Sequence, residues 1–280
     1  MIKVAVPNKG MLCEPTIDLL KACGYKASKA TKSLSSLDLK SGIEFYFLRP
    51  SDIPMYVGKG IIDAGITGID FCAEASSPAV KILDLPFGAS KHCAAVPIES
   101  ECKSLEDLRN LRIATSFPGI VKSFFKNPNM ELVVLEGAVE ISVGLGIADA
   151  VVDVVETGTT LKQAGLRVLG EALFKSNAAL FANPEHKSSP EIATIVRRLE
   201  GKLLALEYKM IEYDVPASLL DKACAITPGI ESPTVAPLQN KSWYSVKAMV
   251  KSEEANPIMD SLLKLGCKGI LLFSIESARI

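Results

Sequence analysis

The sequence lacks the features of a secreted scaffold or a membrane protein. Its seven cysteines include no C-x-x-C pair, whereas disulfide scaffolds and zinc ribbons both predict tight spacing. We therefore expect reduced thiols that lie mostly in the core. No run of about 18 apolar residues occurs, and Met1 to Pro7 reads as a strand running into a turn rather than as a signal peptide. These absences predict a cytoplasmic protein with no membrane partner.

The sequence also has no excess of positive charge and few histidines. The chain has 31 basic and 32 acidic residues, whereas proteins that bind duplex nucleic acid usually carry a basic excess. A nucleic-acid partner is therefore not expected, but small anionic substrates need only a local basic cluster. The two histidines, His92 and His186, fall on a predicted strand and in a loop. Neither has a partner at metal-ligand spacing, and we interpret both as structural.

Strand-like and helix-like segments alternate along the first two thirds of the chain. A length of 280 residues predicts two or three domains, and the alternation predicts α/β domains with parallel or mixed sheets covered by helices. The expected strands cover 2–6, 43–48, 64–67, 81–85, 92–97, 112–115, 132–135 and 150–155. The expected helices cover 14–22, 52–59, 70–75, 104–110, 118–126 and 140–145. Ser104 and Asp107 resemble a capping pair at the start of one of them.

A long predicted helix separates this part from a smaller module. Ser189 suits an N-cap and Pro190 the first helical position, and apolar residues then recur at helical spacing as far as Leu206. After it we expect a strand at 208–214, a helix at 216–224, strands around 235 and at 242–250, a helix at 254–265 and a strand at 269–275. This βαββαβ order is that of a ferredoxin-like module. Such modules often bind regulatory ligands, although fold alone does not establish that.

The most informative segment is D-A-V-V-D-V-V-E-T-G-T-T-L, from Asp149 to Leu161. An apolar strand leads into a loop of small and hydroxylated residues that opens a short helix. Gly158 permits a turn that points N–H groups inward, and the helix N-terminus adds partial positive charge. Thr157, Thr159 and Thr160 add hydroxyl donors. The segment predicts a phosphate cradle, although T-G-T-T alone could equally be a turn with an N-cap.

Charged residues at strand ends could complete a binding site around this cradle. Asp153 lies just upstream of the loop, where a carboxylate could accept a sugar hydroxyl or hold hydrated Mg²⁺. Lys9 and Arg49 each follow a predicted strand, which is where α/β proteins bind ligands. Two acidic residues have a second interpretation: Asp70 could be only a helix N-cap, and Glu140 only a first-turn acidic residue favoured by the helix dipole.

Taken together, these motifs resemble those of the ATP phosphoribosyltransferase family, the first enzymes of histidine biosynthesis. P-x-K-G, R-x-x-D-I-P, D-x-G-I-T-G-x-D, G-A-V-E and D-V-V-E-T-G-T-T-L occur in the family's order. The segment from Gly229 to Leu238, followed by Trp243, resembles the regulatory domain of the long form. The resemblance covers essentially the whole chain. It departs from the commonest phosphoribosyltransferase motif, which has two adjacent acidic residues, because Val154 follows Asp153 here.

The resemblance implies a particular domain organisation. Two periplasmic-binding-protein-like (type II) α/β domains would hold the active site between them, and a C-terminal ferredoxin-like (ACT-like) domain would bind the regulator. On this expectation domain I covers 1–88 and 178–206, domain II covers 89–177 with the phosphate motif, and the regulatory domain covers 207–280. The resemblance also implies a homohexamer in equilibrium with a dimer.

The resemblance further implies an activity. The family transfers the phosphoribosyl group of 5-phosphoribosyl 1-diphosphate to N1 of ATP with Mg²⁺, releases diphosphate, and is inhibited by L-histidine. Carried onto this sequence, the implied catalytic residues are Lys9, Arg49, Glu140 and Asp153. The implied ligand contacts are Asp153, Thr157, Gly158, Thr159, Thr160 and Leu161 for phosphoribosyl diphosphate; Lys9, Arg49, Thr67 and Asp70 for ATP; Asp70 and Asp153 for Mg²⁺; and Asp214, Ile230, Ser232 and Thr234 for histidine.

Three other functions stay open from the sequence. A phosphoribosyltransferase with another acceptor base would share the cradle without using ATP. A solute-binding protein would share the two-lobed fold, but the absence of a signal peptide and the threonine cluster count against it. A regulator that has lost catalysis is disfavoured because the acidic and basic positions are intact. In the last module, Ser232-Pro233-Thr234 could also be only a turn with local hydrogen bonds.

Overall fold

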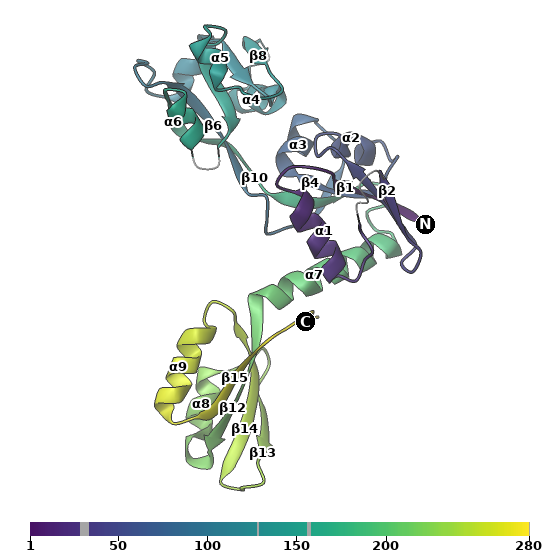
Figure 1. Cartoon of the computed structure of the whole chain (residues 1–280), viewed down its shortest axis with the longest axis vertical. Coiled ribbons are helices and arrows are strands. Elements are labelled where there is room, and N and C mark those ends of the chain that lie inside the picture. The colour runs from purple at the N-terminus through teal and green to yellow at the C-terminus, as the bar shows by residue number, and fades with distance from the viewer. Residues whose placement is uncertain (29–33, 128, 156–157, 280) are drawn as a thin grey trace. The chain divides into compact units, whose positions relative to one another are not determined.

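The chain folds into two units that differ in architecture. The computed structural model describes residues 1–28, 34–127, 129–155 and 158–279. Its contacts divide the chain into Met1–Ala193, which holds a six-stranded and a five-stranded sheet, and Thr194–Ile280, which holds a four-stranded sheet (Figure 1). The expected α/β class is confirmed, whereas the expected boundaries of three domains stay a prediction. Among the described residues, no helix has both the length and the apolar character needed to cross a membrane.

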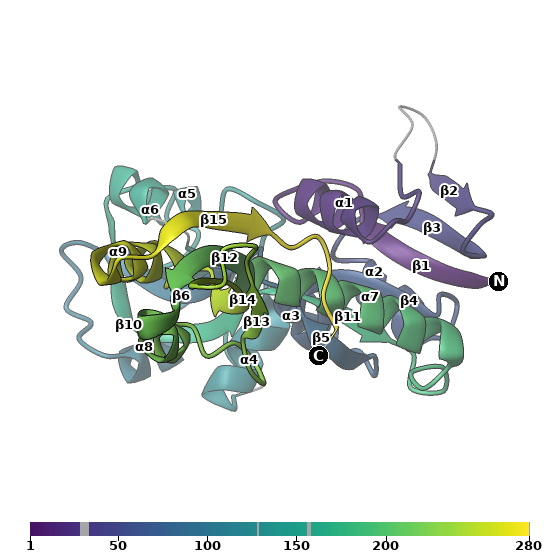
Figure 2. The same ribbon diagram turned by 90° about the horizontal axis from the view of Figure 1, so that it is seen from below.

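The first sheet of unit 1 takes its strands from both ends of that unit. The strand order is β2-β3-β1-β4-β11-β5, with β1 parallel to β3 and β4, and β11 antiparallel to β4 and β5. Every residue of β4 and β11 is buried, as expected for central strands covered on both faces. Helix α1 packs along β1, as Figure 2 shows. The elements are β1 (Ile2–Pro7), α1 (Cys13–Ala22), β2 (Ser35–Asp38), β3 (Ile43–Leu48), α2 (Ile53–Gly58), β4 (Ala64–Gly68), α3 (Ile69–Glu74), β5 (Val80–Asp84) and β11 (Ala178–Ala182).

The second sheet of unit 1 is built from the intervening segment. Its order is β10-β6-β9-β7-β8, and only the β7–β8 and β7–β9 pairs are parallel. Val121 and Phe125 of α4 pack in a core cluster with Val152 of β9, and Leu161 of α6 packs in a second one with Val151. Since Val151 and Val152 are adjacent in a strand, the two clusters cover opposite faces of the sheet. The elements are β6 (Ser90–Pro97), the 3₁₀ turn η1 (Leu105–Asn110), β7 (Ile113–Thr115), α4 (Pro118–Phe125), β8 (Leu132–Val134), α5 (Ile141–Gly144), β9 (Ala150–Val154), α6 (Thr159–Gln163) and β10 (Leu166–Ser176).

Three strands are absent from the sequence-based assignment, and one predicted helix has a different geometry. β2, β10 and β11 were not expected. β10 breaks its pairing register with β6 between Leu169 and Phe174, which obscures the alternation that marks a strand. β11 reads A-A-L-F-A, which has little of the β-branched character of typical strands. The helix expected at 104–110 is a 3₁₀ turn, although the predicted capping pair of Ser104 and Asp107 is confirmed.

Helix α3 links the two sheets of unit 1. It belongs to the first sheet's layer, yet the Glu74 carboxylate accepts hydrogen bonds from the N–H groups of Gly119 and Ile120 at 2.9 and 3.0 Å, at the start of α4. A carboxylate at this end of a helix satisfies free N–H groups and complements the helix dipole. The Phe71 and Phe117 rings also lie 5.6 Å apart. The contact between α3 and α4 therefore joins the layers of the two sheets, in addition to the strands that connect them.

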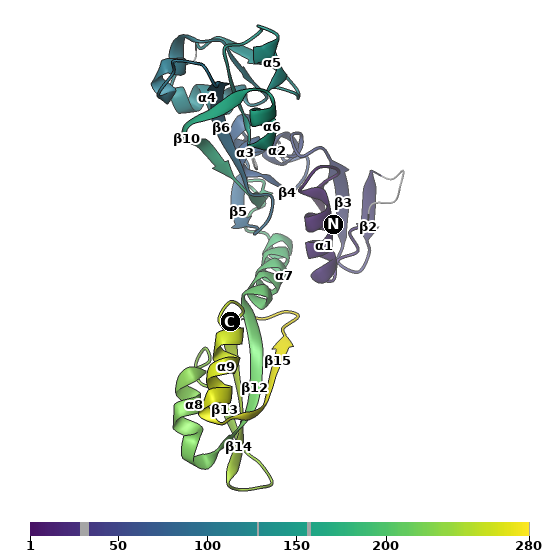
Figure 3. The same cartoon turned by 60° about the vertical axis from the view of Figure 1, so that its left-hand side comes forward.

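Unit 2 follows a βαββαβ order, as predicted. The sheet order is β13-β14-β12-β15, and every pair is antiparallel. Helices α8 and α9 lie on one side of this sheet in Figure 3, and their core includes the fully buried Tyr213 and Leu262.

The N-cap predicted for the long helix is confirmed, because the Ser189 hydroxyl accepts a hydrogen bond from the Ile192 N–H at 3.3 Å. The elements are α7 (Pro190–Glu207), which spans the boundary between the units, and β12 (Tyr208–Pro216), η2 (Ala217–Leu219), α8 (Leu220–Ile226), β13 (Thr234–Pro237), β14 (Trp243–Lys251), α9 (Ala255–Leu265) and β15 (Lys268–Ser274).

All seven cysteines are free, which confirms the expected reduced thiols. Only Cys72, Cys93 and Cys267 are buried, and the other four are partly exposed. The expectation that most of them lie in the core is therefore met only in part. Burial raises the pKa of the Cys72 thiol to about 12, so this thiol is a poor nucleophile at neutral pH.

The tight contact between β4 and α2 gives a test of the packing. A Cβ atom on Gly65 would lie 2.7 Å from Ile53 Cγ2 and 3.0 Å from Ala5 Cβ. We expect Gly65→Ala to lower the free energy of unfolding by about 1–3 kcal/mol, measured by urea denaturation. Gly144→Ala is the control, because nothing lies within 4 Å of its added Cβ and the residue is helical. It should be neutral or slightly stabilising, and equal losses in the two variants would contradict this packing.

Candidate active site

A two-stranded ribbon of β6 and β10 leads from the second sheet to the first. Ser90, Lys91 and His92 of β6 lie opposite Ser176, Lys175 and Phe174 of β10, respectively. The chain enters this ribbon after β5 and leaves it for β11, so the ribbon carries both connections between the sheets. A pocket of 470 Å³ lies against it. Its lining residues are Met11, Gly88, Ala89, Ser90, Lys91, Val155, Lys175 and Ser176.

The predicted phosphate segment begins at the wall of this pocket. Val155 follows β9, lines the pocket, and donates its backbone N–H to the Lys91 carbonyl at 2.7 Å. Gly158 has a φ of 71°, the left-handed conformation that glycine adopts without strain, and it immediately precedes α6. Thr159 and Thr160 are exposed in the first turn of α6. Thr157 lies outside the described residues.

Leu161 has a different place from the threonines before it. Its side chain is 4% exposed and belongs to the core cluster on one face of the second sheet. It therefore fixes α6 to the sheet, so any contact between Leu161 and a ligand would have to come from its backbone. This anchoring is the physical reason why a short helix of five residues can hold a defined position.

Asp153 carries the most informative carboxyl group of the site. It lies near the end of β9, opposite Cys93 of β6. Burial raises the pKa of this carboxyl above its ordinary value; a hydrogen bond from its own strand at Val154 opposes the rise, the Glu140 carboxylate adds to it, and His92 opposes it. The acidic residues Asp153 and Glu140, predicted from separate motifs, are therefore close enough to interact electrostatically. A partly desolvated carboxylate is typical of functional sites.

Asp70 and Thr67 are occupied by contacts within the protein. The Asp70 carboxylate accepts the Phe71 N–H at 2.9 Å and lies 3.1 Å from His92 Nε2. The backbone N–H of Asp70 donates to the Ser176 hydroxyl at 3.0 Å. Thr67 is fully buried and donates its hydroxyl to the Pro50 carbonyl at 2.8 Å. In this structure both residues hold the first sheet's layer together, and Asp70 also holds α3 to the ribbon.

Lys9 and Arg49 are exposed at the ends of neighbouring parallel strands, β1 and β3. The loop that carries Lys9 continues to Met11, which lines the pocket. The Arg49 carbonyl accepts the N–H of Asp52 at the start of α2, so Arg49 stands at the turn between β3 and α2. The strand ends therefore bring both cations to the same edge of the sheet, as predicted.

The residues predicted for an effector lie in unit 2. Asp214 is half-buried on β12, opposite Ser245 of β14, while Ile230, Ser232 and Thr234 are exposed in or just after the loop that leads to β13. The Ser232 hydroxyl donates to the Pro233 carbonyl at 3.3 Å, which is the local bond of the alternative turn interpretation.

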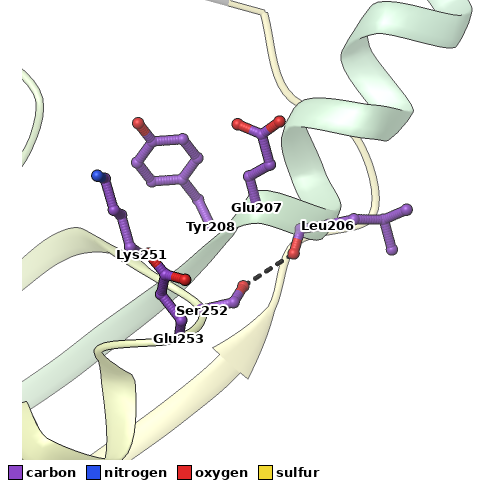
Figure 4. A pocket seen from close by; sticks show the side chains of 6 residues that line it. All are labelled: Leu206, Glu207, Tyr208, Lys251, Ser252 and Glu253. Carbon is purple, nitrogen blue, oxygen red and sulfur yellow. Dashed lines mark hydrogen bonds between the residues drawn. The ribbon is translucent and has the colours of Figure 1, made fainter. Parts of the chain in front are cut away.

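A second pocket, of 370 Å³, lies in unit 2 where α7 passes into β12 (Figure 4). It is formed by Leu206, Glu207 and Tyr208 together with the segment from Lys251 to Glu253. The Ser252 hydroxyl donates to the Leu206 carbonyl at 2.9 Å, and this contact is drawn in Figure 4. None of the four predicted effector residues is among the residues that line it.

The side chains of unit 1 could bind a metal ion only together with a bound ligand that supplies further donor atoms. Among the described residues, no group of three or more His, Cys, Asp or Glu side chains could hold an ion. Mg²⁺ commonly binds one or two carboxylates together with substrate phosphates and water. Asp153 with the nearby Glu140 fits that pattern, whereas the Asp70 carboxylate is already bonded to Phe71 and His92.

Sequence reasoning missed several residues of the pocket. Lys91 and Lys175 are the charged ones, and Ser90 and Ser176 carry buried hydroxyls beside them. Their position in the sequence could have pointed to them. Both lysines fall within three residues of Gly88 and Asn177, where the chain was predicted to pass between domains I and II. His92 was interpreted as structural, and it is fully buried between strands and rings with Nε2 facing Asp70.

Comparison with known proteins decides the family. Residues 49–201 match the model of the ATP phosphoribosyltransferase family, and residues 205–277 match that of the HisG C-terminal domain. The chain belongs to the ATP phosphoribosyltransferase family. This family carries out the first step of histidine biosynthesis, so the predicted transferase class is confirmed.

The relatives cover the whole chain. ATP phosphoribosyltransferases of Bifidobacterium longum (strain DJO10A) and Arthrobacter sp. (strain FB24) are 43% and 44% identical, and each alignment covers 100% of both chains. Among solved structures, the ATP phosphoribosyl transferase (HisG:HisZ) complex from Thermotoga maritima matches with a TM-score of 0.62 and 27% identity. That match covers 97% of the Thermotoga chain but only 71% of this one. This phosphoribosyltransferase therefore has a part that the Thermotoga chain lacks, and this part is comparable in size with unit 2.

The raised pKa of the Asp153 carboxyl gives a stability test. Because the pKa is higher in the folded state than in the unfolded state, folding loses stability as the pH rises through the folded value. Asp153→Asn removes this charge, so we expect it to raise Tm at pH 7.5, with a gain that shrinks toward pH 4.5. Thermal unfolding across this range measures it.

Asp84→Asn is the matched control for this test. A hydrogen bond from Lys81 lowers the pKa of the Asp84 carboxyl, so its stabilisation is present at neutral pH and is lost as the pH falls. Asp84→Asn should therefore lower Tm at pH 7.5. A Tm for Asp153→Asn at or below that of the wild type at pH 7.5 would contradict the desolvation of Asp153.

Proposed function

We propose that the pocket on the β6–β10 ribbon is the active site in which phosphoribosyl diphosphate meets ATP. The single observation that supports this is the position of Val155, which directly follows the strand of the phosphate motif and also forms a wall of the pocket. On this proposal, Gly158 to Leu161 bind the 5-phosphate through backbone N–H groups and threonine hydroxyls. Asp153 and Glu140 face the ribose hydroxyls.

The reaction needs no nucleophile from the protein. N1 of the adenine attacks C1 of the ribose, the bond from C1 to the diphosphate oxygen breaks with inversion, and the electron pair leaves with the diphosphate. The transition state has oxocarbenium character, so the chain contributes alignment and charge stabilisation. Lys9 and Arg49, at the ends of β1 and β3, supply positive charge for the polyphosphate groups.

Mg²⁺ would be held by Asp153 and the substrate phosphates, with water completing the shell. The ion would neutralise phosphate charge and orient the diphosphate. The second predicted ligand, Asp70, accepts the Phe71 N–H and faces His92, so a metal bound there would share the carboxylate with these two partners. These contacts also fix α3 against the ribbon.

Unit 2 would carry feedback control as an ACT-like domain. Its βαββαβ order and its match to the HisG C-terminal domain support this proposal. Asp214 would bind the α-amino group of L-histidine, and the hydroxyls of Ser232 and Thr234 would bind its carboxylate. We further propose a cytoplasmic enzyme, and a homohexamer in equilibrium with a dimer.

The cradle is tested by Thr160→Val. Replacing a hydroxyl that donates to a phosphate should weaken binding of phosphoribosyl diphosphate about tenfold. Isothermal titration calorimetry measures this, and Thr194→Val, a partly exposed helical threonine in α7, serves as the control. Equal affinities in all three proteins would contradict the cradle assignment. Binding without formation of phosphoribosyl-ATP in the wild type, followed by ultraviolet absorbance, would instead point to another acceptor base.

The regulatory site is tested by Asp214→Asn. Loss of the carboxylate removes the ion pair with the amino group of histidine, so the concentration for half-inhibition should rise about tenfold or more. Glu212→Gln is the matched control, because Glu212 lies two residues away on the same face of β12 and pairs with Lys247 at 3.1 Å. Equal inhibition in both variants would remove Asp214 from the site, and a wild type that histidine does not inhibit would refute feedback control.

A further inference from the structure

Two lysines stand directly opposite each other on the ribbon. Lys91 of β6 pairs with Lys175 of β10, both side chains are exposed, and both line the pocket of 470 Å³. Among the described residues, neither lysine has an acidic partner within ion-pair distance. Like charges that face each other across a pair of strands destabilise the sheet. The arrangement therefore favours a ligand of opposite charge in the pocket.

The other face of the ribbon keeps these lysines on the pocket side. His92 is fully buried, lies 3.1 Å from Asp70 through Nε2, and packs against the edges of the Phe117 and Phe174 rings. Because successive residues of a strand point to opposite faces, burial of His92 directs Lys91 away from this interior. Lys175 is the cross-strand partner of Lys91 and is exposed as well, so both lysines lie on the same face of the ribbon. The contact between His92 and Asp70 thus holds β6 with Lys91 on the exposed face of the ribbon.

The lysines are also tied to the phosphate segment. The Lys91 carbonyl accepts the Val155 N–H at 2.7 Å, and Val155 belongs to the same pocket wall. The described part of the cradle, from Gly158 to Leu161, begins three residues later. A ligand whose phosphate sits at the start of α6 would therefore have the two lysines close to its other end.

We propose that Lys91 and Lys175 bind the diphosphate group of phosphoribosyl diphosphate and stabilise its negative charge as it leaves. This rests on the proposed function of the pocket. Two ammonium groups on opposite strands match a group that carries several negative charges, whereas a single 5-phosphate is held at α6. As the bond from C1 to oxygen breaks, the electron pair moves onto the diphosphate, so groups placed there bind the transition state more tightly than the substrate.

The test separates the diphosphate from the other anions of the two substrates. Lys91→Gln, Lys175→Gln and the double variant are compared with Lys122→Gln, a control at an exposed lysine of α4 that does not line the pocket. Calorimetry at fixed Mg²⁺ measures the binding of inorganic diphosphate, ribose 5-phosphate, ATP and AMP. We expect diphosphate affinity to fall about tenfold in each single variant, while ribose 5-phosphate affinity stays within about twofold.

Stability and turnover complete the test. Removing one of two facing charges should leave the Tm of the ligand-free protein unchanged or higher, and kcat should fall more than the affinity for ATP. Unchanged diphosphate binding in both variants, with a wild type that turns over both substrates, would overturn the lysine site alone. A selective loss of ATP over AMP affinity would overturn it as well, because the lysines would then hold the triphosphate. No turnover in the wild type would overturn the proposed function, and the leaving-group role with it.

Discussion

The antiparallel pairing of β6 with β10 is the interaction on which unit 1 depends. The chain leaves the first sheet after β5, returns to it at β11, and makes both passages through this one ribbon. Residues that are far apart in the sequence, Lys91 and Lys175, become direct neighbours there. His92 meets Asp70 at the buried side of the ribbon, and the exposed Lys91 and Lys175 line the pocket together with Ser90 and Ser176. The position of the pocket follows from this pairing.

Helix α3 adds a second connection between the first and the second sheet of unit 1. Asp70 at its start faces His92 on the ribbon, and Glu74 at its end accepts two N–H groups at the start of α4. A helix of only six residues would not be stable by itself in water, so these contacts, together with packing, define its place. Thr67 and Asp70 of the motif D-A-G-I-T-G-I-D hold together the layer from which Lys9 and Arg49 project.

The predicted phosphate segment combines apolar burial with a partly desolvated carboxyl group at one strand end. Val151 and Val152 are buried on opposite faces of the second sheet, which holds β9 firmly, and one residue later the strand carries a partly desolvated carboxyl group, Asp153. Leu161 anchors α6 from the other side of the loop. Apolar burial thus fixes β9 and α6, the two elements on either side of residues 156 and 157. The raised pKa of Asp153 predicts that its charge lowers folding stability, a feature that is typical of groups at functional sites.

How much was predictable depends on the range of the interactions. The sequence alone determined the α/β class, the βαββαβ order of unit 2, the caps at Ser104 and Ser189 and the family, because apolar periodicity, capping and motif order are local properties. The sequence also predicted that Gly158 permits a turn before α6, and the structure shows this residue with a φ of 71°. Only the tertiary structure decided that β10 and β11 exist as strands, that Thr67 and Asp70 are occupied within the protein, and that Lys91 faces Lys175. Each of these depends on pairing between segments that are far apart in the sequence. The register of that pairing is set by tertiary packing and not by local sequence patterns.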